Sequence, residues 1–219
     1  MGVFAHPDDE IFAGGTLATF AKDRDVYLVC MTNGEAGINS SKKPIELGLL
    51  RKDELRGSAK ALGVKDVFFL DYGDGELCNN LYSTMADKLR ECIEKLDPEI
   101  LLTFESRGVS GHMDHALTSM VTSYVFEKLP NAKELWYYCF DESERKRFKE
   151  HFENFFVYVP GGYKKSDISK VISAESVWDK KVKAMREHES QKHDIEKLIE
   201  IFMEQKKEEY FIILNKDTV

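Results

Sequence analysis

The chain has no long apolar run, no closely spaced cysteine pair and no excess of positive charge. Its 219 residues carry 31 Lys and Arg against 39 Asp and Glu, which gives a formal net charge of −8. Because binding to a phosphate backbone needs a basic surface, we expect no nucleic acid as the main partner. The apolar stretches are far shorter than the ~18 residues that a transmembrane helix needs, so we also expect no membrane span.

The four cysteines form no C-x-x-C pair. Cys30 and Cys139 lie in apolar, strand-like runs and Cys92 lies in a helix-like run, which indicates buried and reduced thiols. The N-terminal residues pass directly into a polar motif around His6, without the basic segment and apolar core of a signal peptide. These features predict a cytoplasmic protein.

Apolar, β-rich runs alternate with runs of helical period along the first 130 residues. Strands are predicted at 2–5, 26–32, 66–70 and 99–104, and helices at 10–23, 44–62, 81–96 and about 112–128. This order is typical of an α/β fold with a doubly wound, mostly parallel sheet and helices on both faces. Right-handed crossovers would place the first and fourth strands side by side.

The pattern changes beyond residue 130. Further strands are predicted at 134–140, 154–159 and 210–214, and helices near 141–151, 174–187 and 190–204. No Gly/Ser-rich linker and no internal repeat separates the two parts. We therefore expect a single domain over 1–219, with a core of about 1–130 and a C-terminal α+β extension of about 131–219.

Two clusters of His and Asp directly follow two of the predicted strands. Residues 5–10 read Ala-His-Pro-Asp-Asp-Glu, and residues 112–115 read His-Met-Asp-His. Open parallel sheets bind ligands beyond the carboxyl ends of their strands, where strand order reverses. The sequence therefore predicts one metal site assembled from two loops.

The residue types in the two clusters indicate a catalytic metal. Residues three apart share one side of a helical turn, so His6 and Asp9 are predicted to share an ion while Asp8 points elsewhere. His115 is the better third ligand from the second cluster. Two imidazoles and a carboxylate leave a position open, as in catalytic zinc sites, although this set also suits Fe(II). Asp8 would then take the proton of a metal-activated water.

The second cluster also contains groups that are not needed as ligands. His112 lies one helical turn from His115 and is predicted to face the substrate. Asp114 is available to orient an imidazole, fixing its tautomer and favouring the imidazolium form. A positively charged His112 would stabilise an oxyanion or protonate a leaving amine.

These motifs in combination resemble the PIG-L/LmbE-like family of zinc-dependent N-deacetylases. The matching motifs lie at 5–10, 14–17, 32–35, 51–54, 71–75, 111–115 and 188–191. The resemblance implies a Rossmann-like fold, a Zn²⁺ cofactor and hydrolysis of an N-acetyl group on a glucosamine-type sugar. It implies the same ligands and base, and His112 assisting the tetrahedral intermediate with Asp114 behind it. It also implies substrate contacts from Arg51, Asp74 and His188. By spacing alone, His188 is better interpreted as structural.

Alternatives stay open at this point. A metal-dependent amidase acting on a larger sugar or thiol conjugate would share the site and differ in pocket size. A non-catalytic sugar-binding module would not need Asp8, and an Fe(II) oxygenase is disfavoured by the α/β order. The sequence selects no particular amino sugar as the small-molecule substrate, and it is compatible with a homo-oligomer.

Overall fold

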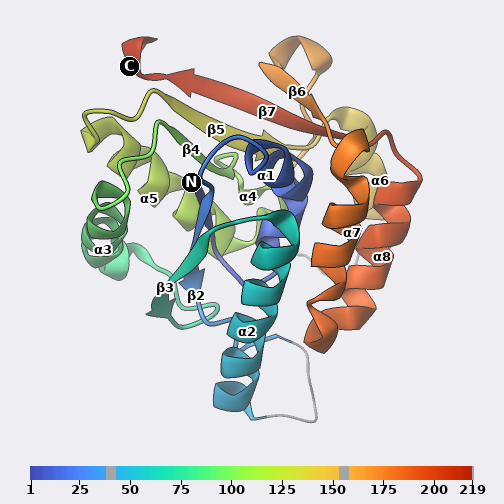
Figure 1. Ribbon diagram of the computed structural model, residues 1–219, viewed down its shortest axis with the longest axis horizontal. Coiled ribbons are helices and arrows are strands. Elements are labelled where there is room, and N and C mark those ends of the chain that lie inside the picture. Colours follow the sequence, from blue (N-terminus) through green and yellow to red (C-terminus); the bar gives the residue numbers. More distant parts are fainter. Residues whose placement is uncertain (38–42, 153–157, 219) are drawn as a thin grey trace.

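A seven-stranded sheet in the order β3-β2-β1-β4-β5-β7-β6 organises the chain (Figure 1). The computed structural model describes residues 1–37, 43–152 and 158–218. The strands are β1 Gly2–Phe4, β2 Tyr27–Thr32, β3 Asp66–Tyr72, β4 Ile100–Phe104, β5 Glu134–Cys139, β6 Lys170–Ser173 and β7 Glu208–Asn215. The α/β fold with a mostly parallel sheet is confirmed, and β1 does lie between β2 and β4 as the crossover rule predicts.

Strands β1 to β5 are parallel, and β7 pairs antiparallel with both β5 and β6. Strand β6 was not predicted, because its residues are mostly exposed and carry no strong apolar alternation. The expected strand at 154–159 falls largely on 153–157, which lie outside the described residues, and 158–159 form no strand.

Helices cover both faces of the sheet (Figure 1). They are α1 Gly14–Phe20, α2 Pro44–Leu62, α3 Tyr82–Glu94, α4 Gly108–Gly111, α5 Met113–Lys128, α6 Glu142–Phe152, α7 Trp178–Arg186 and α8 Lys192–Met203. Successive β1 residues point to opposite faces: Phe4 joins the core under α1, α2, α7 and α8, whereas Val3 joins the core under α3 and α5. None of the helices in the described ranges is long and apolar enough to cross a membrane.

The predicted helix at 10–23 is divided in two. A 3₁₀ turn, η1, runs over Asp9–Ala13, and α1 begins afresh at Gly14. The buried Glu209 of β7 explains this new start, since its two carboxylate oxygens accept hydrogen bonds from the backbone N–H groups of Gly15 and Thr16, each at 2.7 Å. The C-terminal extension thereby fixes the segment that follows the first His/Asp cluster.

Candidate metal centre

The first cluster lies in the turn between β1 and η1. The backbone N–H of His6 donates to Oδ2 of Asp9 at 2.7 Å, which draws the Asp9 carboxylate back toward the imidazole. Asp8 has a φ of 122°, a strained conformation for a non-glycine residue. This conformation separates the two neighbouring carboxylates, so that Asp8 lies against Arg51 while Asp9 faces the imidazoles.

The second cluster follows β4 through a strained loop. Val109 has a φ of 61°, and its backbone N–H donates to Oε1 of the buried Glu105 at 3.1 Å. Oε2 of Glu105 accepts hydrogen bonds from the backbone N–H and Nε of Arg107 and from the hydroxyl of Tyr163. The loop ends at His112, which is the N-cap residue of α5. Sequence reasoning missed Glu105, although a lone acidic residue at the end of an apolar strand is a usable signal.

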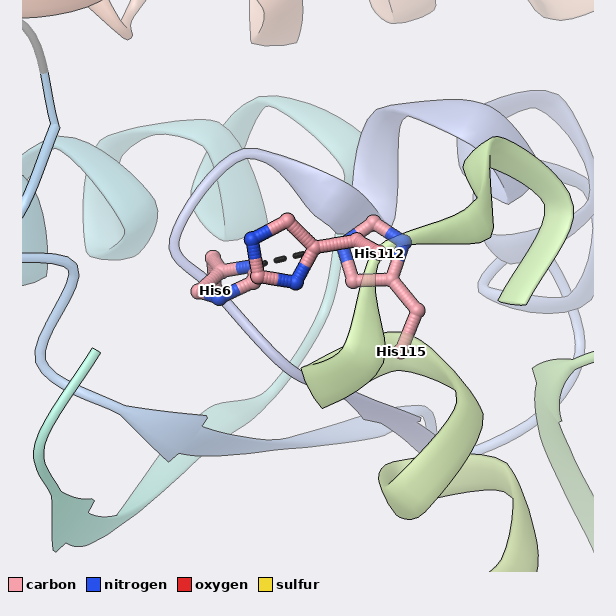
Figure 2. Close-up of side chains that lie close together, drawn as sticks. All are labelled: His6, His112 and His115. Atoms are coloured by element: carbon pink, nitrogen blue, oxygen red, sulfur yellow. Dashed lines mark hydrogen bonds between the residues drawn. The ribbon is translucent and has the colours of Figure 1, made fainter. Parts of the chain in front are cut away.

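Ligand atoms of three residues from the two clusters converge. Nδ1 of His6 lies 3.1 Å from Nε2 of His115 and 3.3 Å from Oδ2 of Asp9, and Nε2 of His115 lies 3.1 Å from Oδ1 of Asp9. Figure 2 shows the imidazoles of His6, His112 and His115 gathered at this point. Ligands bound tetrahedrally at 2.0–2.1 Å are about 3.3 Å apart, so the spacing fits a single zinc-sized cation.

Among the described residues, two groups that offer one ligand atom per residue have these atoms within 4.8 Å of one another: His6 with His112 and His115, and His6 with Asp74 and Asp114. In the first, Nδ1 of His112 already accepts the backbone N–H of Asp114. The second uses Nε2 of His6, on the far side of the ring from Asp9. We favour the set with Asp9 because each two of its residues have ligand atoms within 3.3 Å, Oδ2 of Asp9 lying nearest His6 and Oδ1 nearest His115.

The tautomer of His115 is set by its surroundings. Its Nδ1 lies 3.1 Å from the carbonyl oxygen of Gly108 and 3.2 Å from Oγ of Ser110. Because a carbonyl can only accept, Nδ1 carries the proton and Nε2 has a free lone pair. The ring of Phe104 stacks on the imidazole with centroids 4.3 Å apart and an interplanar angle of 9°. The imidazole is thus oriented before any ion binds.

Two carboxylates lie against Nε2 of His6, at 3.0 Å for Asp74 and 3.3 Å for Asp114. Asp114 is buried and accepts the backbone N–H of Gly75 at 2.8 Å. It therefore orients His6, and the expectation that it lies behind His112 is wrong. Asp74 contacts the same imidazole and also lines the cavity. Its predicted role in binding substrate stays a prediction, and the contact with His6 is an additional one.

The N-cap position of His112 decides its protonation. The backbone N–H of Asp114 donates to Nδ1 of His112 at 3.2 Å, so Nδ1 carries no proton. Burial, together with the nearby imidazoles of His6 and His115, lowers the pKa of His112 below its ordinary value. The lowered pKa acts against the predicted imidazolium form, and the hydrogen bond at Nδ1 leaves Nε2 as the nitrogen that can donate.

Charge and burial act in opposite directions on the other cluster residues. Burial would lower the pKa of His6, but the charge of Asp9 and hydrogen bonds to three carboxylates raise it well above its ordinary range. Burial would raise the pKa of Asp9, but the adjacent His115 and His6 hold it well below. Burial raises the pKa of Asp8, against the opposing charge of Arg51 and with a further increase from Asp9.

Arg51 of α2 is 4% exposed. Its guanidinium donates to the carbonyl oxygens of Gly34 at 2.7 Å and Pro7 at 2.6 Å, and to Oδ2 of Asp8 at 2.8 Å. These contacts commit the guanidinium to holding the first cluster. Arg51 therefore positions Asp8, and because it also lines the cavity its contact with substrate stays a prediction.

His188 is fully buried and does not line the cavity, so its predicted substrate contact is wrong for this structure. Its Nε2 lies 2.8 Å from Oε1 of Glu10, which also accepts the hydroxyl of Ser58. The other oxygen of Glu10 accepts the backbone N–H of Asp8 at 3.1 Å. Glu10 outweighs the effect of burial and raises the pKa of His188. The His188–Glu10 pair therefore supports the first cluster through the backbone of Asp8.

The clusters open into a cavity of about 300 Å³. Its lining includes the two clusters with Arg51 and Asp74. It also includes side chains that the sequence did not single out, from η1, α6 and the region of α8: Ile11, Phe12, Phe148, Phe152, Gln191, Asp194 and Leu198.

Comparison with protein families gives a match over residues 1–126 to the PIG-L family, described as GlcNAc-PI de-N-acetylase. A Bacillus anthracis protein named as a probable N-acetyl-alpha-D-glucosaminyl L-malate deacetylase 2 is 29% identical over 143 residues, which is 63% of this chain and 63% of that protein. The chain thus spans less than two thirds of that relative's length.

Two solved structures share the fold. The N,N′-diacetylchitobiose deacetylase of Pyrococcus horikoshii has a TM-score of 0.75 at 23% identity, covering 98% of this chain and 83% of that one. The 4-carboxy-2-hydroxymuconate hydratase of Pseudomonas putida has a TM-score of 0.73 at 18% identity, covering 97% and 94%. Because one neighbour is a deacetylase and the other a hydratase, the shared fold alone does not select a reaction.

Proposed function

The chain belongs to the PIG-L family, and on this basis we propose that it is a metal-dependent hydrolase that removes the N-acetyl group from an N-acetylglucosamine-type substrate. Acetate and a free amine are the products. The observation that carries the proposal is the convergence of His6, Asp9 and His115 within 3.3 Å, in the lining of a cavity and beside a strained Asp8. A binding module would not need the strained carboxylate, whereas an amide hydrolase needs a base at this place.

The proposed ligands are Nδ1 of His6, a carboxylate oxygen of Asp9 and Nε2 of His115. Their donor set suits Zn²⁺, with Fe²⁺ as the other candidate. When bound, the ion supplies Lewis acidity and lowers the pKa of a coordinated water. Asp74 and Asp114 accept hydrogen bonds from Nε2–H of His6, and the carbonyl of Gly108 accepts one from Nδ1–H of His115. Nδ1 of His6 and Nε2 of His115 are therefore the nitrogens left to bind the ion.

Asp8 is the proposed general base. It lines the cavity, and Arg51 holds it at 2.8 Å so that it does not turn toward Asp9. The carboxylate takes a proton from water as the oxygen attacks the amide carbon. It returns this proton to the nitrogen when the C–N bond breaks, so that the amine leaves neutral.

His112 is the proposed donor to the carbonyl oxygen. Its Nδ1 accepts from the start of α5, so Nε2–H is the group left to donate. A hydrogen bond from this N–H strengthens as negative charge develops on the oxygen, which lowers the barrier without any proton transfer. A neutral donor is therefore sufficient, and Asp114 is not required behind it.

The proposal is tested by acetate release from N-acetylglucosamine and a small panel of its glycosides, with Zn²⁺ or Fe²⁺ added back to metal-free protein. Asp8→Asn should retain one equivalent of metal and lose about 10²–10⁴-fold in kcat. His115→Ala should lose the metal itself. The matched control is His151→Ala, which replaces an exposed histidine of α6 and should change neither quantity.

Opposite results would reject distinct parts of the proposal. Full activity in Asp8→Asn would remove the base assignment, and unchanged metal content in His115→Ala would remove the ligand assignment. Absence of acetate release from every substrate, with hydration of an unsaturated acid instead, would reject deacetylation. A cytoplasmic location and a homo-oligomeric state stay predictions from the sequence.

A further inference from the structure

The cavity next to the metal centre has a lining of two chemically different parts. Part of its lining comes from the two His/Asp clusters. Another part is apolar and is called here the apolar wall: Ile11 and Phe12 of η1, Phe148 and Phe152 of α6, and Leu198 of α8. Ile11, the first residue of the wall, is two residues after the proposed ligand Asp9.

Aromatic packing makes the apolar wall a fixed surface. The ring of Phe12 lies 6.4 Å from that of Phe148, which stacks on Phe152 at 4.8 Å. The Phe12 ring also meets Phe202 at 6.2 Å from the α8 side. Rings that interlock in this way are held in place, so the shape of the wall does not depend on a ligand.

The charges around the cavity oppose an anionic substrate group. Four carboxylates line it: Asp8, Asp9, Asp74 and Asp194. Arg51 is the only lysine or arginine among the described lining residues, and its guanidinium is engaged by Asp8, Pro7 and Gly34. A carboxylate of the substrate would therefore meet no free cationic side chain among the described lining residues, apart from the metal centre itself.

We propose that the apolar wall is a subsite for a hydrophobic group of the substrate, so that this protein prefers N-acylated amino sugars bearing an alkyl or aryl group over those bearing an anionic one such as malate. This inference rests on the proposed function. The hydrophobic group has two possible sources, the N-acyl chain or the aglycone, and both present the same chemistry to the wall.

Two substrate series separate these sources. The first varies the acyl chain on glucosamine from acetyl to butanoyl to hexanoyl, and the second varies the aglycone of N-acetylglucosamine from methyl to butyl to hexyl. Each methylene that enters the wall should raise kcat/KM by up to about fourfold. We expect a rise of at least tenfold across one series, which identifies the group that occupies the wall. The malate glycoside should fall below the methyl glycoside.

Variants of α8 connect the effect to the wall. Leu198→Asn replaces an apolar lining side chain by a polar one of similar size and should flatten the rising series, whereas Leu198→Met should preserve it. The matched control is Met203→Asn on the same helix, where the side chain is 58% exposed and outside the cavity. This control should retain the slope of the wild-type protein.

The possible results are distinguishable. Flat or falling series with normal N-acetylglucosamine hydrolysis, or a preference for the malate glycoside, would overturn the subsite and leave the proposed function standing. No hydrolysis of any compound would instead overturn the proposed function. In that case, calorimetry with hexyl and methyl glycosides still decides on the subsite, since equal affinities would reject it and at least tenfold tighter hexyl binding would support it.

Discussion

The buried ion pair between Lys181 of α7 and Glu209 of β7 offers a quantitative test of how the C-terminal extension is joined to the core. The two side chains lie 2.7 Å apart and are 2% and 1% exposed. Lys181 also donates to the carbonyl oxygen of Phe12, and Glu209 accepts the N–H groups that begin α1. Lys181→Met keeps most of the side-chain volume and removes the charge together with the hydrogen bond to Phe12.

The expected cost follows from what the substitution leaves behind. Glu209 would remain wholly buried and charged, with two backbone donors but no counter-ion. Removing one partner of a buried pair typically costs about 3–5 kcal/mol. For a chain of this size that corresponds to a fall in Tm of roughly 6–20 °C. Because the pair reaches both η1 and α1, we expect a single transition that moves as a whole.

Urea and thermal unfolding of Lys181→Met, Glu209→Gln and the double variant provide the measurement. The double variant should lose less than the sum of the single losses, since it leaves no isolated charge. Lys183→Met, an exposed lysine of the same helix, is the control and should change stability by less than about 0.5 kcal/mol. A loss below 1 kcal/mol in Lys181→Met, or strictly additive losses, would refute the reasoning. Two separate transitions would contradict the prediction of a single domain.

Further predictions concern the metal centre and a buried acid. Asp114→Asn should weaken metal binding by about 10–100-fold, because Asp114 contacts the proposed ligand His6. Competition with a chelating dye measures this affinity. A lower kcat with unchanged metal affinity would instead support the predicted place of Asp114 behind His112. Glu105→Gln should cost about 1–3 kcal/mol in urea unfolding, since it weakens the anchor of the strained Val109; unchanged stability would contradict this. Burial raises the pKa of Glu144 well above 4.5, so the folded state keeps a proton that the unfolded state releases. Stability should therefore fall as pH rises above about 4.5, by up to ~1.4 kcal/mol per unit, and Glu144→Gln should flatten this fall.

The sequence predicted the elements whose signals are local. Strands β1 to β5 and helix α2 were placed to within about two residues, because apolar alternation, Pro44 and the C-terminal Gly63 mark them directly. The exposed β6 lacks such a signal. The division of the first helix depends on Glu209, which is nearly 200 residues away, so no local pattern could reveal it.

Spacing and residue type also selected the side chains that converge at the centre. His6, Asp9 and His115 were identified because a strand end and a helical turn have fixed geometry. The contacts of the residues that surround these three side chains were predicted less accurately. Arg51, Asp114 and His188 were given partners by proximity in sequence or by resemblance, whereas their actual partners lie on other elements of the fold.

The sequence by itself determined the alternation of strands and helices in the first 130 residues, the positions of the two polar clusters at strand ends and the chemistry that those residue types allow. Tertiary structure decided what each side chain contacts: that Asp114 faces His6, that His112 is the N-cap residue of α5, and that η1, α6 and α8 contribute an apolar wall to the cavity lining. The physical reason is that the alternation of strands and helices follows from short-range geometry, whereas hydrogen-bond partners, burial and cavity shape depend on distances between segments far apart in the chain.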